Sequence, residues 1–257
     1  MKELELDAER ETQRICEFIK RELASSGLND IAIGVSGGVD SALVAALCVR
    51  TIGQDRVHPL IMPYRTSSPE SIEHAMLLAQ KFALKPETIE ITPAVDKLKE
   101  MLEVVDTRRL GNIMARTRMI ILYDRSARHN AIVAGTGNRT EALLGYTTLH
   151  GDSACGFAPI AHLYKTQVRQ LAAHLGVPKE IIEKSPTADL WTGQTDEGEL
   201  GFTYAEADSL LFEKFNNKKS DAELEAMGFA HIFIARVNNM IARSDFKRRM
   251  PNSLQAE

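Results

Sequence analysis

Short apolar runs alternate with longer amphipathic stretches along this chain. Each short run is bounded by Gly, Pro or polar residues, which is typical of strands buried in a sheet. These predicted strands are residues 31–35, 57–63, 88–91 and 131–135. In the longer stretches, apolar residues recur at helical spacing or the run continues without a helix breaker. These predicted helices are residues 8–25, 41–50, 69–82, 93–103, 113–130 and 165–175.

The alternation of strands and helices predicts an α/β protein. Right-handed crossovers between such strands give a parallel, Rossmann-like sheet flanked by helices. Ligands of these sheets bind beyond the carboxyl ends of the strands, so the turns after Val35, Ile61 and Ala134 are expected on one functional rim. Residues 184–201 are polar, Gly-rich and long for a connection, which indicates a functional loop. Thr203 and the glutamate three residues later match the capping box of a further helix.

Composition narrows the class of protein. The 257 residues carry 31 Lys and Arg against 35 Asp and Glu, and this balance argues against a dedicated nucleic-acid binder. No stretch approaches the roughly 18 apolar residues of a membrane span, and the charged N-terminus does not resemble a signal peptide. Cys16, Cys48 and Cys155 are too widely spaced to suggest a disulfide framework or a zinc site. We therefore expect a cytoplasmic protein that binds neither nucleic acid nor a membrane.

The turn after the first predicted strand is the strongest chemical signal. It reads Ser36-Gly37-Gly38-Val39-Asp40-Ser41. Paired glycines let successive N–H groups converge on an anion, and the following helix presents its positive end at the same place. A carboxylate beside such a phosphate site implies an intervening cation, so Asp40 predicts Mg²⁺. The pattern is neither a Walker loop nor a dinucleotide fingerprint, and a purely structural strand–helix turn is the alternative.

This hexapeptide resembles that of the pyrophosphate-cleaving ATP enzymes, whose fold is called adenine-nucleotide alpha-hydrolase-like. Later segments are similar to the NAD synthetases, in particular to their ammonia-dependent, single-domain type. The similarity runs in order from about residue 10 to residue 251. The segments that carry it are residues 112–119, 135–141, 150–152, 185–191 and 194–197.

The resemblance implies ATP as co-substrate and Mg²⁺ as cofactor. It assigns Asp40 and Glu141 to the metal and gives catalytic roles to Asp40, Lys165 and Thr187. The residues that it implies for ATP binding are Gly34, Val35, Ser36, Gly37, Gly38, Val39, Asp40, Ser41, Met62, Thr136, Lys165 and Thr187. The alternative without a functional role is a solvated side chain for Glu141, a surface side chain for Lys165 and an ordinary turn residue for Thr136.

The resemblance also implies an acid substrate, deamido-NAD, that is adenylated and then amidated by ammonia. Arg116, Asp152 and Lys247 would bind deamido-NAD, with Arg116 in a groove between the subunits of a homodimer. Helix geometry alone equally allows Arg116 and Arg118 to be exposed charges. The chain is expected to be one domain over residues 1–257 without a glutaminase domain, so ammonia would arrive free or from a separate glutaminase.

Three positions depart from the family pattern. Leu149 stands where the family usually has Lys, Gly156 where it has Asp, and Phe246 where a His precedes Lys247. All three are expected in the deamido-NAD pocket, whereas the ATP and Mg²⁺ positions are intact. The alternative function is therefore an amide ligase of the same chemistry that adenylates a different carboxylate. A tRNA-modifying thiolase would need paired cysteines and a basic groove, and a non-catalytic nucleotide-binding regulator would tolerate loss of Asp40.

Overall fold

The computed structural model describes residues 4–189, 191 and 193–250. Within them lies a four-stranded sheet in the order β3-β2-β1-β4, in which every neighbouring pair is parallel. The strands are β1 (Asp30–Gly34), β2 (Val57–Ile61), β3 (Glu87–Thr88) and β4 (Ala131–Val133). The α/β class and the parallel sheet predicted from the hydrophobic pattern are confirmed.

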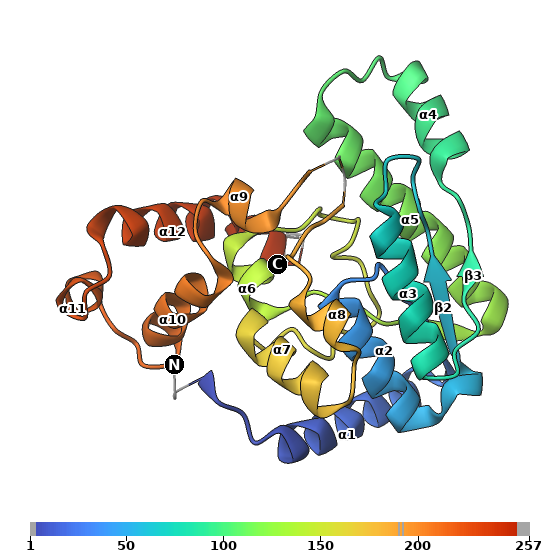
Figure 1. The fold of residues 1–257 in the computed structure, drawn as a ribbon, viewed down its shortest axis with the longest axis horizontal. Coiled ribbons are helices and arrows are strands. Elements are labelled where there is room, and N and C mark those ends of the chain that lie inside the picture. Colours follow the sequence, from blue (N-terminus) through green and yellow to red (C-terminus); the bar gives the residue numbers. More distant parts are fainter. Residues whose placement is uncertain (1–3, 190, 192, 251–257) are drawn as a thin grey trace, which may run out of the picture.

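The helix that follows β1 is the centre of the main hydrophobic core. This helix, α2 (Val39–Ile52), is apolar almost all round, and a helix of that kind must be covered on every side. The sheet covers one side, and α1 (Ala8–Ser26) and α7 (Lys165–His174) cover others (Figure 1). The phosphate-loop hexapeptide, at the start of α2, is therefore attached to the best-packed part of the molecule.

The remaining helices complete the flanks of the sheet and a separate helical group. Figure 1 shows α10, α11 and α12 together on one side of the sheet, while α4 projects at another end of the molecule. These elements are α3 (Pro69–Lys81), α4 (Thr92–Met101), α5 (Thr107–His129), α6 (Arg139–Leu144), α8 (Lys179–Glu183), α9 (Asp196–Leu200), α10 (Tyr204–Phe215), α11 (Asp221–Ala226) and α12 (His231–Ser244), with 3₁₀ turns η2 (Gln54–Arg56) and η3 (Asp245–Arg248).

Helices α10, α11 and α12 pack around a second hydrophobic core, to which α6 and the start of α7 also contribute. Leu210, Leu211 and Val237 are fully buried and cluster with Leu144 of α6 and Tyr164 at the start of α7. The predicted capping box that opens α10 is confirmed. Helices α6 and α7 therefore lie between the two cores, and both contact α10.

Two predicted boundaries differ from the structure, and three short helices were not predicted. Helix α5 begins at Thr107 rather than 113, because Asp106 accepts the N–H of Arg109 at 2.7 Å and caps an earlier turn. Strand β3 is shorter than predicted, although the N–H of Ile89 still donates to the carbonyl of Ile61 at 2.9 Å. Helices α6, α8 and α9 were not predicted. A capping box between Asn138 and Glu141 opens α6, and α9 lies within the stretch predicted as a functional loop.

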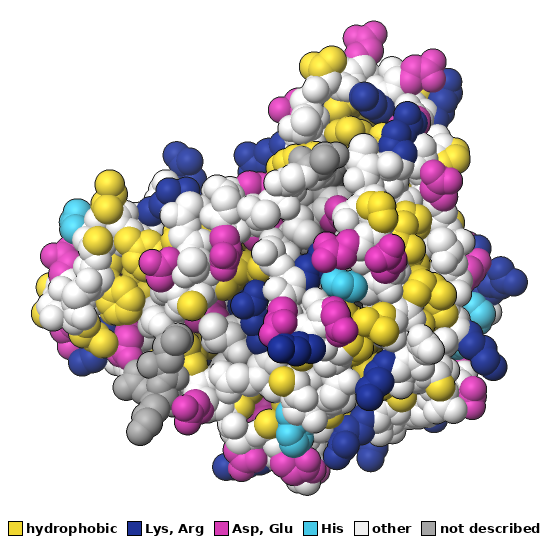
Figure 2. Space-filling model, viewed as in Figure 1, with side chains coloured by type: hydrophobic (Ala, Val, Ile, Leu, Met, Phe, Trp, Pro, Cys, Tyr) yellow, Lys and Arg dark blue, Asp and Glu magenta, His cyan; other side chains and the backbone are white. Residues whose placement is uncertain are grey.

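The face of the molecule drawn in Figure 2 is mixed in charge. Figure 2 shows Lys and Arg side chains interspersed with Asp and Glu over the visible face, with no single sign covering it. Among the described residues, no helix is long and apolar enough to cross a bilayer.

Candidate active site

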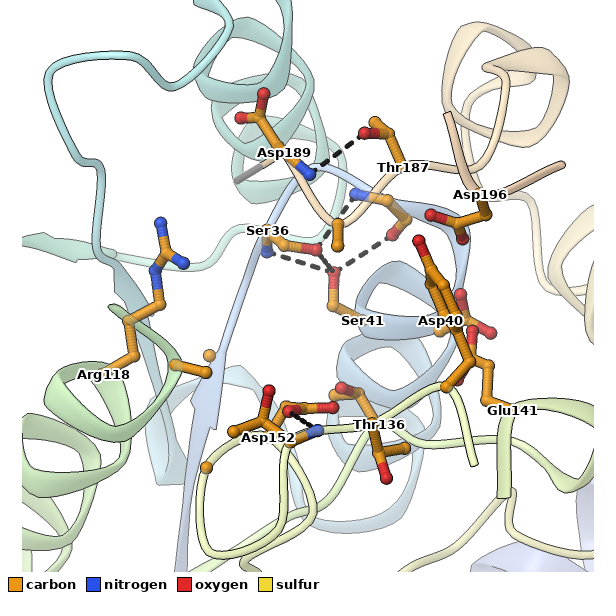
Figure 3. Close-up of a pocket in the computed structure, with 18 of the residues that line it drawn as sticks. Ser36, Asp40, Ser41, Arg118, Thr136, Glu141, Asp152, Thr187, Asp189 and Asp196 are labelled. Atoms are coloured by element: carbon orange, nitrogen blue, oxygen red, sulfur yellow. Dashed lines mark hydrogen bonds between the residues drawn. The ribbon is translucent and has the colours of Figure 1, made fainter. Parts of the chain in front are cut away.

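A cavity of about 1090 Å³ opens at the carboxyl edge of the sheet. Its wall includes Val35, Ile61 and Ala134, so the three turns predicted to share one rim do so. The polar loop after α8 and residues 240–247 line other sides. Figure 3 shows the side chains that converge there, with Asp40 and Glu141 on one side and Arg118 on the other.

The hexapeptide forms a closed loop over the start of α2. The Ser36 N–H donates to Ser41 Oγ at 3.2 Å, and Ser41 Oγ donates to the carbonyl of Gly38 at 3.0 Å. The two hydroxyl oxygens are 3.1 Å apart (Figure 3). Gly38 at the N-cap makes no side-chain hydrogen bond to the helix, so the first-turn N–H groups are available to a ligand. The serine hydroxyls thus close the loop on itself by accepting the N–H groups of Ser36 and Gly38.

Gly37 has a conformational role rather than a contact role. The cavity wall contains the other residues of the predicted loop but not Gly37. Its φ is 78°, in the left-handed region, and a Cβ there would overlap the carbonyl oxygen of Ser71 on α3. Glycine therefore lets the loop turn and lets α3 approach it closely.

Lys165, Asp40 and Glu141 form a buried charge cluster beneath the loop. Lys165 Nζ lies 2.5 Å from Asp40 Oδ2 and 2.9 Å from Glu141 Oε1, and its side chain is only 4% exposed. Asn138 Nδ2 donates to the other oxygen of Asp40 at 2.8 Å, and the ring of Tyr204 lies 4.9 Å from Nζ. The three residues predicted for phosphate and metal chemistry are thus brought together.

Opposing effects set the charges of this cluster. Burial alone would lower the pKa of Lys165, but the charges of Asp40 and Glu141 outweigh it and raise that pKa above its ordinary value. Lys165 therefore stays protonated. Burial raises the pKa of Glu141, while Lys165 opposes that rise. The ammonium is what allows two carboxylates to share this buried place.

The donor set fits a Mg²⁺ ion that is shared with a phosphate ligand. Asp40 and Glu141 present hard carboxylate oxygens to one point, from two different helices. In the described part of the chain, no group of three or more His, Cys, Asp or Glu side chains is arranged to hold a metal by itself. Mg²⁺ commonly takes one or two protein carboxylates and completes its shell with water and substrate phosphates.

The predicted functional loop is tied to the start of α3. Thr187 lines the cavity, and its Oγ1 accepts the N–H of Asp189 at 3.0 Å. The carboxylate of Asp189 accepts the N–H of Ser68, the N-cap of α3, at 3.0 and 3.1 Å. Lys184 Nζ donates to Ser71 Oγ on the same helix at 2.9 Å. Residues 190 and 192 of this loop lie outside the described residues.

The residues predicted for the acid substrate line the other end of the cavity. Arg116 donates from Nε and Nη2 to the carbonyl of Leu149, both at 3.2 Å. Asp152 Oδ1 accepts the N–H of Thr148 at 2.7 Å. These side chains shape the turn that surrounds them and also present charge to the cavity.

Lys247 and the preceding residue, Phe246, also line the cavity. Lys247 Nζ donates to the carbonyls of Gly145 and Thr147 at 2.8 and 2.6 Å. Phe246 lines the cavity and is 61% exposed, in the position where the family pattern has His. The 3₁₀ turn η3 is therefore attached to the turn after α6.

The expectation that all three departures lie in one pocket was wrong for Gly156. Leu149 and Phe246 line the cavity, but Gly156 does not. A Cβ at Gly156 would lie 2.5 Å from Ile132 Cγ1, so β4 leaves no room for a side chain there without a shift. This departure therefore reflects close packing of the backbone on the sheet.

Arg118 is a site residue that sequence reasoning left undecided. Its Nε donates to the carbonyl of Met62, at the end of β2, at 2.9 Å, and its guanidinium lines the cavity (Figure 3). Whether Arg118 faces the cavity depends on which face of α5 packs on the sheet. The sequence alone does not show this, because the charged residues of α5 do not mark that face. Asn138 was missed as a partner of Asp40, although Asn138 followed by Glu141 fits a capping box.

Together, the parallel sheet, the phosphate loop and the carboxylate–lysine cluster define a nucleotide-binding α/β enzyme. A profile of the NAD synthase family matches residues 11–251. An NH(3)-dependent NAD(+) synthetase of Chlorobium phaeobacteroides is 50% identical over 234 residues, 91% of this chain and 84% of that protein. One of Trichlorobacter lovleyi is 45% identical over 98% of this chain and 92% of that protein.

Solved structures agree. The NH3-dependent NAD synthetase of Campylobacter jejuni matches with a TM-score of 0.84 at 33% identity, over 98% of this chain and all of that one. The NMN synthetase of Francisella tularensis matches with a TM-score of 0.87 at 31% identity and the same coverage. The chain belongs to the NAD synthase family. It has the adenine-nucleotide alpha-hydrolase-like fold that was predicted, and ATP is the co-substrate of this family.

Proposed function

We propose that this chain catalyses the ATP-dependent amidation of deamido-NAD with ammonia. A carboxylate oxygen of the nicotinate group attacks the α-phosphorus of ATP, and pyrophosphate leaves. Ammonia then adds to the acyl-adenylate carbonyl, the C–O bond to AMP breaks, and the nitrogen loses a proton to give the amide of NAD. The observation that carries this proposal is the Lys165–Asp40–Glu141 cluster beneath an uncapped helix N-terminus, in a chain of this family.

The chain's own contribution is to hold the phosphates and balance their charge. The N–H groups of the first turn of α2, which no side chain caps, bind phosphate oxygens without reorganising, which favours the more negative transition state. Lys165 is placed to move from a carboxylate to a phosphate oxygen over a short distance. Thr187, in the polar loop after α8, offers a hydroxyl to the same cavity.

Mg²⁺ belongs to this proposal, and Asp40 and Glu141 would hold it. When bound, the ion offsets the charge of the phosphates that approach the two carboxylates. Asn138 keeps Asp40 oriented throughout, because its amide donates to the oxygen that faces away from Lys165.

The acid would lie between Arg116 and Lys247. Both cations line the same cavity as the phosphate loop, where the phosphates of a dinucleotide can pair with them. We propose a homodimer, because α5 leaves Ile120 61% and Tyr123 39% exposed on the helix that carries Arg116. Light scattering at micromolar concentration tests this, with a monomer as the contrary result.

Ammonia is the proposed nitrogen donor, delivered free or by a separate glutaminase. Support comes from the curated relatives, which are NH3-dependent synthetases at 41–50% identity over most of the chain. We also propose that residues 1–257 act as one domain, because both hydrophobic cores contribute walls to the same cavity.

The test is product stoichiometry with two competing acids. With deamido-NAD, ATP, Mg²⁺ and saturating ammonium, NAD, AMP and pyrophosphate should form in equal amounts. Nicotinate mononucleotide is the second acid, because Leu149 and Phe246 change this end of the cavity and an NMN synthetase matches the fold over its full length. A higher kcat/KM for the mononucleotide would transfer the proposal to that acid, and absence of AMP with either acid would refute adenylation.

A further inference from the structure

Asp208 is a buried carboxylate that lies outside the cavity. It is on α10, in the helical group away from the sheet, and its side chain is completely shielded from solvent. An ionisable side chain in such a place needs partners that satisfy both of its oxygens. Asp208 has them, and they belong to two other helices.

Each oxygen of Asp208 contacts the residue next to a member of the charge cluster. Oδ1 accepts the hydroxyl of Thr140, which precedes Glu141, at 2.5 Å. Oδ2 accepts the N–H of Thr166, which follows Lys165, at 2.7 Å. The two oxygens of one carboxylate therefore join the Thr140 side chain of α6 to the backbone of α7, next to the residues Glu141 and Lys165.

Thr140 closes this arrangement. Its Oγ1 accepts the N–H of Lys165 at 3.1 Å while its own hydroxyl proton is donated to Asp208. Thr140 is fully buried, so water does not replace either bond. The first turn of α7 also carries the positive end of a helix, and a carboxylate satisfies that end better than a neutral group does.

We propose that Asp208, acting through Thr140, is a positioning residue that fixes the separation between Lys165 and Glu141 during adenylation. This rests on the proposed function, because the separation matters only if the pair serves the ATP phosphates. Misplacement of a catalytic group by about 1 Å can lower a rate by about 100-fold. Asp208 touches neither substrate, so the effect should appear in kcat rather than in the KM for the acid.

The experiment compares Asp208→Asn, Thr140→Val and Thr140→Ser in the full chain. We expect Asp208→Asn and Thr140→Val to lower kcat for pyrophosphate release by about 10- to 100-fold, with little change in the KM for the acid. Thr140→Ser keeps the hydroxyl and should retain kcat within about threefold. The Mg²⁺ concentration for half-maximal rate should rise in the first two variants only.

The comparison of Thr140→Ser with Thr140→Val separates a positioning role from a merely structural role. Thr140→Ser removes a buried methyl group, whereas Thr140→Val keeps the side-chain volume, so a packing role predicts that Ser is as harmful as Val. The matched control is Glu213→Gln, a buried carboxylate on the same helix whose Oε2 accepts Asn217 Nδ2 at 2.9 Å. This control should keep the parental kcat.

The outcomes distinguish this inference from the proposed function. If Thr140→Val keeps the parental kcat, or if Thr140→Ser loses as much activity as Thr140→Val, the positioning role is refuted. If the parental chain turns over no acid, the proposed function fails, and calorimetric binding of Mg²⁺–ATP then tests positioning instead. Weaker binding in Thr140→Val with parental binding in Thr140→Ser supports it, and equal binding overturns it.

Discussion

Replacing Lys165 with Met removes the cation that Asp40 and Glu141 share, while keeping most of the side-chain volume. The carboxylates then face each other, with Asn138 as the remaining side-chain donor to Asp40. Their side chains are 17% and 15% exposed, so solvent compensates only in part. We therefore expect Lys165→Met to destabilise the fold in the absence of divalent cations.

The expected loss follows from the burial of the pair. Removing one partner of a buried ion pair costs about 3–5 kcal/mol, and the partial exposure of the carboxylates places this case near 3 kcal/mol. For a chain of this size, that corresponds to a decrease in Tm of about 6–12 °C. The matched control is Lys179→Met, because Lys179 pairs with Glu183 at the surface with 80% of its side chain exposed. Its expected loss is below about 1 kcal/mol.

Mg²⁺ makes this prediction specific. In Lys165→Met the two carboxylates are free to bind the ion, so millimolar Mg²⁺ should recover much of the lost stability in scanning calorimetry. At a concentration 100-fold above its Kd, the ion adds about 2.7 kcal/mol. The rate of adenylation should stay about 100- to 1,000-fold down, because the phosphates still lack the lysine. Equal stabilisation of the variant and the parental chain by Mg²⁺ would contradict this account of the cluster.

Three further changes test other parts of the site. Gly37→Ala should lower the free energy of unfolding by about 2–4 kcal/mol and weaken ATP binding. The alanine would have to adopt a left-handed φ, and its Cβ would overlap the carbonyl oxygen of Ser71 on α3. An unchanged denaturant midpoint would contradict this. Burial raises the pKa of Glu141, and a protonated carboxyl no longer binds Mg²⁺. On acidification, the Mg²⁺ concentration needed for half-maximal rate should therefore begin to rise at a higher pH than for an ordinary glutamate. Glu141→Gln should abolish that pH dependence. Lys247→Met leaves two carbonyls without their donor, so the KM for the acid should rise about 10-fold while the KM for ATP stays constant in steady-state assays; an equal rise in both would refute its assignment to the acid end.

The sheet and the phosphate side of the site could be predicted because local patterns determine them. A short apolar run before Gly37 and Gly38 specifies a strand, a tight turn and a helix N-terminus within a few residues. Parallel topology then brings the turns after β1, β2 and β4 to one edge, so residues far apart in the sequence meet there. The resemblance to a family added Lys165 and Glu141, which spacing alone did not place.

The acid end could not be predicted in the same way, because tertiary packing decides it. Whether Arg118 faces solvent or the cavity depends on the register of α5 against β2, and that long helix gives only a weak amphipathic signal. Gly156 was misplaced because the closeness of its backbone to Ile132 depends on how a loop lies on β4. The role of Asp208 depends on contacts among three helices that are distant in sequence.

The central claim is that a carboxylate oxygen of the acid becomes bonded to the α-phosphorus of ATP. Deamido-NAD with both nicotinate carboxyl oxygens replaced by ¹⁸O tests this directly, with mass spectrometry of the AMP that forms. Because the C–O bond breaks when ammonia attacks, each AMP should carry one ¹⁸O and each NAD amide should keep one. Unlabelled AMP, or label in inorganic phosphate with formation of ADP, would contradict adenylation at this site.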